Sequence, residues 1–295
     1  VYSRWFSTCV LSSIPRVFSL FPNLGAWPIW PVDEKHFTRS AMGPVANPGI
    51  VTGLHAEAAL IRKLSSKTGT EPTVACHGPG PGPARAAAKE LVSQCVGGLI
   101  SFGFAGGIDE GVAAGKIVLA TEIRDGRRDY KRTTDPWRDA VRRTVHWTTV
   151  PVEAPIAGVD GIVKEAADKT RLRYETGAVA ADMESFSVGK VARDAGLPFI
   201  AIRAISDPAL QSLPVLALDA VDNKGRLKIW RVLFSLIRHP GQVGELRRLA
   251  KNTRAATNSL TEVCEQIAPH FCLPDFRSQL IRQLRVAGGH HSLPR

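Results

Sequence analysis

The stretch Phe199-Ile-Ala-Ile-Arg-Ala-Ile-Ser-Asp207 is an apolar run that a single arginine interrupts. Residues that are apolar on both faces are typical of a central strand in a parallel sheet, which is buried on both sides. Because side chains alternate along a strand, Arg203 and Asp207 are expected on the same face. A buried arginine needs a carboxylate partner, which Asp207 or Glu184 could supply.

Asp207 stands at the end of this predicted strand, where ligands bind in open α/β sheets. A carboxylic acid that is partly removed from water has a raised pKa and can act as a general acid. The alternative is that Asp207 only begins a turn before Pro208, which is a common position for aspartate. The sequence leaves both interpretations open.

Outward from this strand, short apolar runs alternate with helical patterns along the chain. This alternation predicts an α/β fold, with a single mostly parallel or mixed sheet and helices on both faces. Gly196 and Pro198 end the last of these helices. The predicted strands cover residues 49–54, 73–76, 98–105, 116–123, 176–182 and 199–205, and the predicted helices cover 57–66, 83–95 and 184–195.

We expect four parts along the chain. The first is rich in proline and tryptophan without a regular period, and because the first methionine is Met42, we expect the protein to begin near there. After the α/β domain, apolar residues recur at helical spacing among basic ones, in two helices separated by Pro240-Gly241. The parts are 1–45, an irregular extension; 46–224, the α/β domain; 225–268, a basic amphipathic helical extension with its second helix at 243–267; and 269–295, a loose tail.

Composition narrows the class of protein. The 295 residues are 44% hydrophobic, enough for a sizeable core. The five cysteines are odd in number and widely spaced, which argues against a disulfide framework and fits a reducing compartment. We find no zinc-binding pattern of cysteine and histidine, and no apolar run long enough to span a membrane.

The net charge of +11 is unevenly distributed. From Gly225 onward there are 12 lysines and arginines against 4 acidic residues, whereas the preceding part carries 26 against 23. A basic segment indicates an acidic partner, such as lipid head groups, nucleic acid or an acidic protein. The alternative is a solvated helical face with no partner.

Three more places combine polar residues with the ends of predicted strands. In Asp182-Met-Glu-Ser185, Glu184 either stabilises the start of a helix or grips a vicinal diol, with Met183 as a soft apolar wall. The glycines of 103–107 allow a ligand close to the backbone. They are not a dinucleotide-binding motif, because too few residues follow before the next strand for the required helix. The turn 78–85 is a candidate anion site at a helix start, with Arg85 adding charge.

Taken together, these places resemble the superfamily of nucleoside phosphorylases and methylthioadenosine/adenosylhomocysteine nucleosidases, over residues 49–210. The resemblance rests on Asp182-Met-Glu-Ser185 and Arg203-Ala-Ile-Ser-Asp207, with Gly103-Phe-Ala-Gly-Gly107 and Thr52-Gly-Leu-His-Ala-Glu57 in support. The chain is also similar to the hopanoid-associated phosphorylases. The segments that carry this similarity are 99–107, Thr176-Gly-Ala with Asp182-Met-Glu184, Asp207-Pro-Ala and the Arg-His-Pro-Gly-Gln segment.

This resemblance implies roles for individual residues. Asp207 would protonate N7 of the departing purine, Glu184 would bind the ribose hydroxyls, and Glu57 takes the place of the carboxylate that positions water in nucleosidases. Phe104 stands where many relatives carry a serine or threonine that touches phosphate or sugar. The candidate catalytic residues are Asp207, Glu184 and Glu57; the substrate-binding residues are Met183, Asp182, Arg203, Ser206, Gly103, Phe104 and Gly53; the phosphate-binding residues are Gly80, Gly82 and Arg85.

The resemblance further implies an activity. We expect phosphorolysis of an adenosyl compound, with adenosylhopane converted to phosphoribosylhopane and adenine, inorganic phosphate as co-substrate, and no cofactor or metal. One alternative is a nucleosidase that uses water held by Glu57. The other is a non-catalytic module that binds a purine or nucleic acid, although the sequence contains no recognisable nucleic-acid-binding motif. We expect a cytoplasmic homo-oligomer, with the basic C-terminal helices in peripheral contact with a membrane and no nucleic-acid partner.

Overall fold

The computed structural model describes residues 47–65, 72–126, 129–213, 224–225, 243–268 and 270–274. The N-terminal extension, the first predicted C-terminal helix and most of the predicted loose tail lie outside these residues, so their predictions stay predictions.

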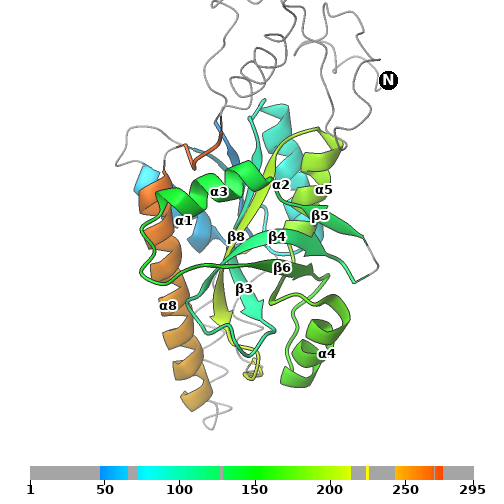
Figure 1. The fold of residues 1–295 in the computed structure, drawn as a ribbon, viewed down its shortest axis with the longest axis vertical. Helices are drawn as coiled ribbons and strands as arrows, with labels where there is room; N and C mark the ends of the chain where they lie inside the picture. Colours follow the sequence, from blue (N-terminus) through cyan, green and yellow to red (C-terminus); the bar gives the residue numbers. More distant parts are fainter. Residues whose placement is uncertain are drawn as a thin grey trace, which may run out of the picture. The chain divides into compact units, whose positions relative to one another are not determined.

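An eight-stranded mixed sheet organises the described residues (Figure 1). β3 and β8 lie side by side in parallel, with Leu99 opposite Phe199. β8 also pairs with β4 in antiparallel orientation. β4 pairs with β6 and β6 with β7 in parallel, and β7 pairs with β3 in antiparallel orientation, so these five strands form a closed circuit. The strands are β1 Gly49–Val51, β2 Thr73–Ala75, β3 Leu99–Gly107, β4 Ile117–Arg124, β5 Tyr130–Arg132, β6 Val152–Gly158, β7 Ala180–Asp182 and β8 Phe199–Asp207.

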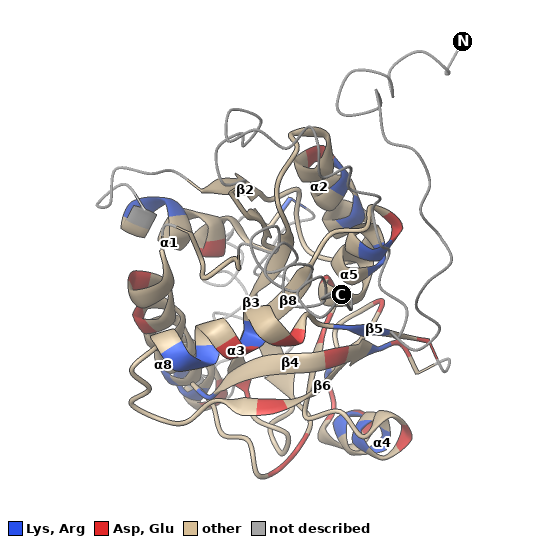
Figure 2. Cartoon of the chain, turned by 45° about the horizontal axis from the view of Figure 1, so that its top comes forward, with Lys and Arg blue, Asp and Glu red and all other residues tan. Residues whose placement is uncertain are grey.

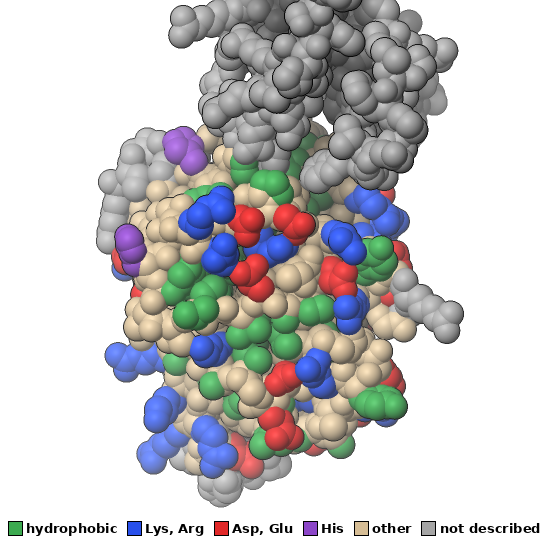
Figure 3. Space-filling view, viewed as in Figure 1, with side chains coloured by type: hydrophobic (Ala, Val, Ile, Leu, Met, Phe, Trp, Pro, Cys, Tyr) green, Lys and Arg blue, Asp and Glu red, His purple; other side chains and the backbone are tan. Residues whose placement is uncertain are grey.

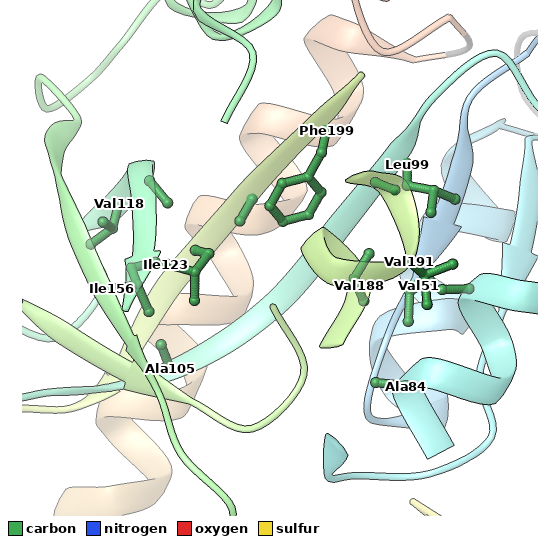
Figure 4. Close-up of a cluster of buried hydrophobic side chains, with 14 of the residues drawn as sticks. Val51, Ala84, Leu99, Ala105, Val118, Ile123, Ile156, Val188, Val191 and Phe199 are labelled. Atoms are coloured by element: carbon green, nitrogen blue, oxygen red, sulfur yellow. The ribbon is translucent and has the colours of Figure 1, made fainter. Parts of the chain in front are cut away.

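Helices cover the sheet on both faces, as the sequence predicts. A first apolar cluster, with Val51, Leu99, Val188 and Val191, joins the strands to α2 and α5 (Figure 4). A second cluster lies under α1, α3 and α8 and includes the fully buried Trp137. The helices are α1 His55–Ser65, α2 Pro81–Ser93, α3 Asp135–Thr144, α4 Ala166–Thr176, α5 Ser185–Asp194 and α8 Val243–Ile267.

Four elements, β5, α3, β6 and α4, lie in a stretch where no apolar period predicts them. In α3 only Trp137 and Val141 are buried, one turn apart, so the apolar stripe is short, and β6 is interrupted by Pro155. In α4 the two buried residues are polar, Lys169 and Thr176. Because hydrophobic periodicity detects apolar stripes, a helix that buries a lysine escapes it.

The C-terminal half of the long helix α8 packs against the core. Its apolar side packs against the sheet, with Leu260, Val263 and Cys264 buried. Beyond it, Phe271 is fully buried and its carbonyl accepts a hydrogen bond of 2.7 Å from Nε1 of Trp137. The residues just after α8 are therefore packed, where the sequence predicted a loose tail from residue 269.

The N-terminal half of α8 is different, because it carries exposed basic side chains (Figures 2 and 3). The apolar side of its C-terminal half is not available to a membrane, because the core already covers it. Within the described residues no helix has the length and hydropathy that crossing a membrane requires. The exposed basic residues are Arg247, Arg248, Lys251 and Arg254.

Candidate active site

The ends of β1, β3, β7 and β8 bring Glu57, Asp182 and Glu184 together around Arg203. The side chain of Arg203 is completely buried, and its Nε lies 2.6 Å from Oδ2 of Asp182. Its Nη2 donates to Oγ of Ser101 at 2.6 Å and lies 3.5 Å from Oε2 of Glu184. Arg203 is thus the counter-charge of a group of buried carboxylates, as a buried charge requires.

The partner of Arg203 corrects one prediction. The sequence named Asp207 or Glu184 as the possible partner. Glu184 does contact Arg203, at 3.5 Å, but the closest carboxylate is that of Asp182, and no contact joins Arg203 to Asp207. The reason is a register shift at the end of β8, where Ala105 pairs with Ile205 but Gly106 pairs with Asp207. Strict alternation does not extend across such an irregularity, so Asp207 is aimed differently from Arg203.

Glu57, in the first turn of α1, is held by three backbone amides. Its Oε1 accepts a hydrogen bond from the amide of Phe104 at 2.8 Å, and its Oε2 accepts from Gly53 and Leu54 at 3.1 and 2.9 Å. Burial raises the pKa of Glu57 to about 7, against the opposing effects of Arg203 and these amides. A carboxyl with this pKa can accept a proton near neutral pH.

Glu184 immediately precedes α5 and points into the same group. Its Oε1 accepts a hydrogen bond of 2.9 Å from the amide of Gly80, and burial raises its pKa, against the opposing charge of Arg203. Gly53 lies so close that a Cβ there would meet Oε1 of Glu184 at 2.8 Å. The side chain therefore does more than favour the start of a helix, because it lines the site.

Gly103 is required where β3 passes this group. Its φ of 154° lies in the region that favours glycine, and a Cβ would meet Oε1 of Glu57 at 2.3 Å and Nη1 of Arg203 at 2.8 Å. The glycine motif thus makes room for the protein's own charged groups. Phe104 contributes through its backbone, because its amide binds Glu57 and its carbonyl accepts from Arg203 at 3.3 Å.

Asp207 lies at the end of β8, beside Gly106 rather than Gly103. Nζ of Lys169 donates to its Oδ2 at 2.6 Å, and the hydroxyl of Ser206 donates to its Oδ1 at 2.8 Å. Burial raises the pKa of Asp207, while the charge and hydrogen bond of Lys169 oppose that rise. Asp207 is therefore a desolvated acid with a cation as its partner.

Residues 44–238 match the family model described as the Phosphorylase superfamily. The chain belongs to the phosphorylase superfamily. A search of curated protein sequences gave no match.

Solved structures show the same fold in enzymes of this superfamily type. A methylthioadenosine/adenosylhomocysteine nucleosidase from S. pneumoniae, with a transition-state inhibitor, is 16% identical, covers 75% of this chain and 99% of its own, and superposes with a TM-score of 0.54. The corresponding enzyme from Neisseria meningitidis is 17% identical, with coverages of 74% and 98% and a TM-score of 0.54. A futalosine hydrolase mutant of Helicobacter pylori is 16% identical, with coverages of 74% and 98% and a TM-score of 0.54.

Within this phosphorylase-superfamily chain, the predicted phosphate loop is placed differently from the expectation. The amide of Gly80 is bonded to Glu184, so it already has an acceptor. Gly82 and Arg85 are exposed on the first turns of α2, and no contact joins them to the carboxylates. Met183 is half-buried beside Glu184.

Lys169 is the functional candidate that sequence reasoning missed. It lies on α4, in a segment of mixed charged residues. Its side chain is only 1% exposed, and this burial distinguishes it from the charged residues around it. Long charged side chains are almost never fully buried unless they are paired. Nothing in the sequence pattern signals that this lysine faces inward, because its carboxylate partner is far away in the chain.

Proposed function

We propose that this chain cleaves the N-glycosidic bond between the ribose and the purine of an adenosyl compound. The observation that carries the proposal is the set of buried carboxyls, Glu57, Glu184 and Asp207, each with a raised pKa. They lie at or after the ends of β1, β7 and β8, which all pair with β3. Perturbed acids gather at active sites. The nucleosidases and the futalosine hydrolase that share the fold support the same reaction type.

Cleavage of the glycosidic bond requires a proton donor at the purine and negative charge near the sugar. The purine leaves more readily when N7 gains a proton, which the carboxyl of Asp207 would supply from its place at the end of β8. The sugar becomes oxocarbenium-like, and Glu184 would bind its hydroxyls and stabilise the developing positive charge. Asp207 lies beside Gly106 on β3, whereas Glu184 lies beside Gly53 and accepts from the amide of Gly80.

For the acceptor, the site favours water held by Glu57. The donors of the two buried cations in the described part of the site are already engaged, those of Arg203 by oxygens of the site and those of Lys169 by Asp207 and two carbonyls. A phosphate dianion needs cations or free amides. Glu57, with a pKa of about 7, is suited to take the proton of an attacking water.

This role of Glu57 predicts the acid side of the pH profile. Burial raises the pKa of Glu57 to about 7, so its base form is present above that pH and is lost below it. We expect kcat/KM for adenine release to fall about tenfold per pH unit below 7. The Glu57→Gln variant should lose this limb together with most of its activity, whereas Glu110→Gln, on the surface, should keep both. A flat profile from pH 5 to 8 would rule out Glu57 as the base.

Phosphorolysis of adenosylhopane is the second candidate, favoured by the resemblance of 99–107 and 207–209 to hopanoid-associated phosphorylases. The exposed basic half of α8 supports contact with an anionic lipid surface near such a substrate. With either acceptor, we propose a cytoplasmic homo-oligomer.

Adenine release separates the two acceptors. Methylthioadenosine and adenosylhopane would each be incubated with the protein, with and without inorganic phosphate, and free adenine and the sugar product measured. We expect equal rates without phosphate and a free ribosyl product, because Glu57 supplies the base for water. Strict dependence on phosphate, with a sugar phosphate as product, would overturn the hydrolytic proposal in favour of phosphorolysis.

A further inference from the structure

Lys169 occupies a place that packing does not explain. Its side chain is 1% exposed, although α4 is otherwise a polar surface helix. An ammonium group removed from water is unfavourable unless its donors are all satisfied. Something in its surroundings must therefore compensate for its burial.

The three protons of the Lys169 ammonium have three acceptors in one short segment. Nζ donates to Oδ2 of Asp207 at 2.6 Å, to the carbonyl of Pro208 at 3.1 Å and to the carbonyl of Gln211 at 2.9 Å. The lysine thus joins α4 to the end of β8 and to the turn that follows. It fixes both the carboxyl and the backbone that carries it.

No other charged group contacts the Asp207 carboxyl among the described residues. Ser206 donates its hydroxyl to Oδ1, Gly106 on β3 presents only backbone, and Arg203 is engaged by Asp182 and Glu184. A carboxylate formed at Asp207 therefore depends on Lys169 for its counter-charge. A buried carboxylate without one is strongly disfavoured.

We propose that Lys169 is the positioning residue of the acid, which holds Asp207 against the departing purine and stabilises the carboxylate that remains after the proton is given away. This inference rests on the proposed function. In the step, the bond between C1′ of the ribose and the purine nitrogen breaks, its electrons move to the purine, and the proton of the Asp207 carboxyl moves to N7. The oxygen of the attacking water forms a bond to C1′, and the water gives a proton to Glu57. The ammonium of Lys169 lies beside the new charge and neutralises it.

The test compares Lys169→Met with Lys169→Gln. The methionine removes both the charge and the hydrogen bonds, whereas the glutamine amide removes the charge and can still donate to the carbonyls. We expect both to lower kcat for adenine release about 10²-fold with KM little changed, because the effect lies in the proton-transfer step. We also expect the alkaline limb of the pH profile to move to higher pH in both, because Asp207 loses the charge that opposes its raised pKa.

Two controls distinguish an effect on folding from an effect of the lost charge at Lys169. Arg171→Met removes a cation from the exposed side of the same helix and should leave kcat and the pH profile unchanged. Thermal unfolding midpoints report folding, and Lys169→Gln keeps the test usable if Lys169→Met does not fold. If kcat falls in both lysine variants but the alkaline limb of the pH profile does not move, Lys169 has only a structural role and the proposal is overturned.

The failure of this inference differs from the failure of the proposed function. If Lys169→Gln has the wild-type kcat and pH profile while Asp207→Asn is inactive, the inference fails and the function stands. If the wild-type protein releases no adenine from any adenosyl substrate, the function itself fails.

Discussion

The Asp207→Asn variant is expected to lose adenine release by a factor of roughly 10²–10⁴ while remaining folded. Asparagine has the shape of aspartate but cannot deliver a proton to N7. Lys169 keeps its two carbonyl acceptors at Pro208 and Gln211, and the asparagine oxygen can replace Oδ2 as the third. The buried cation is therefore not stranded, and the loss should lie in kcat rather than in folding.

Rates of adenine release and thermal unfolding, measured on the same preparations, check this result. Asp168→Asn is the matched control, because it makes the same change at an exposed position of α4. Activity of Asp207→Asn within about threefold of the wild type would end the assignment of Asp207 as the acid.

The second large effect concerns stability. Arg203→Met should destabilise the fold by about 3–5 kcal/mol, because it leaves the carboxyls of Asp182, Glu184 and Glu57 buried without their counter-charge. At this chain size the midpoint of thermal unfolding should fall by about 10 °C. Calorimetry at neutral pH would measure the loss directly.

The pairing can be tested by a second substitution. Combining Arg203→Met with Asp182→Asn removes the carboxylate closest to the arginine and should recover part of the lost stability, because fewer charges remain unpaired. Arg142→Met, at a half-exposed position of α3, serves as the control. Equal unfolding midpoints for Arg203→Met and the wild type would contradict the role of Arg203 as the shared counter-charge.

Local sequence patterns were sufficient for the strands that are apolar on both faces and for α8, whose predicted bounds coincide with the observed ones. Polar residues at the ends of buried strands also pointed to Glu184 and Asp207 as candidates, whereas Glu57 was expected only from the family resemblance. Local patterns failed where the deciding contact is made by a residue far along the chain. The partner of Arg203 depended on a register shift, and Lys169 depended on how α4 turns.

The predicted phosphate loop, which stays a prediction, shows a related limit of sequence patterns. A glycine-rich turn before a helix offers free amides, but the sequence cannot tell which acceptor will take them. In the fold, a carboxylate of the protein itself, Glu184, takes the amide of Gly80. The assignment of an external anion to 80–85 therefore remains a prediction that the observed contacts do not favour.

The closed circuit of β3, β8, β4, β6 and β7 has a consequence for how the protein reaches its native state. The circuit closes through residues that are far apart in the chain, Leu99 with Phe199 and Gly106 with Ala181. The chain therefore loses much conformational entropy before the favourable contacts of these pairings form. Arg203 meets Asp182 and Ser101 only when the same strands have come together. Slow folding and late, cooperative acquisition of activity are therefore expected to go together, with no partly folded species able to act on a nucleoside.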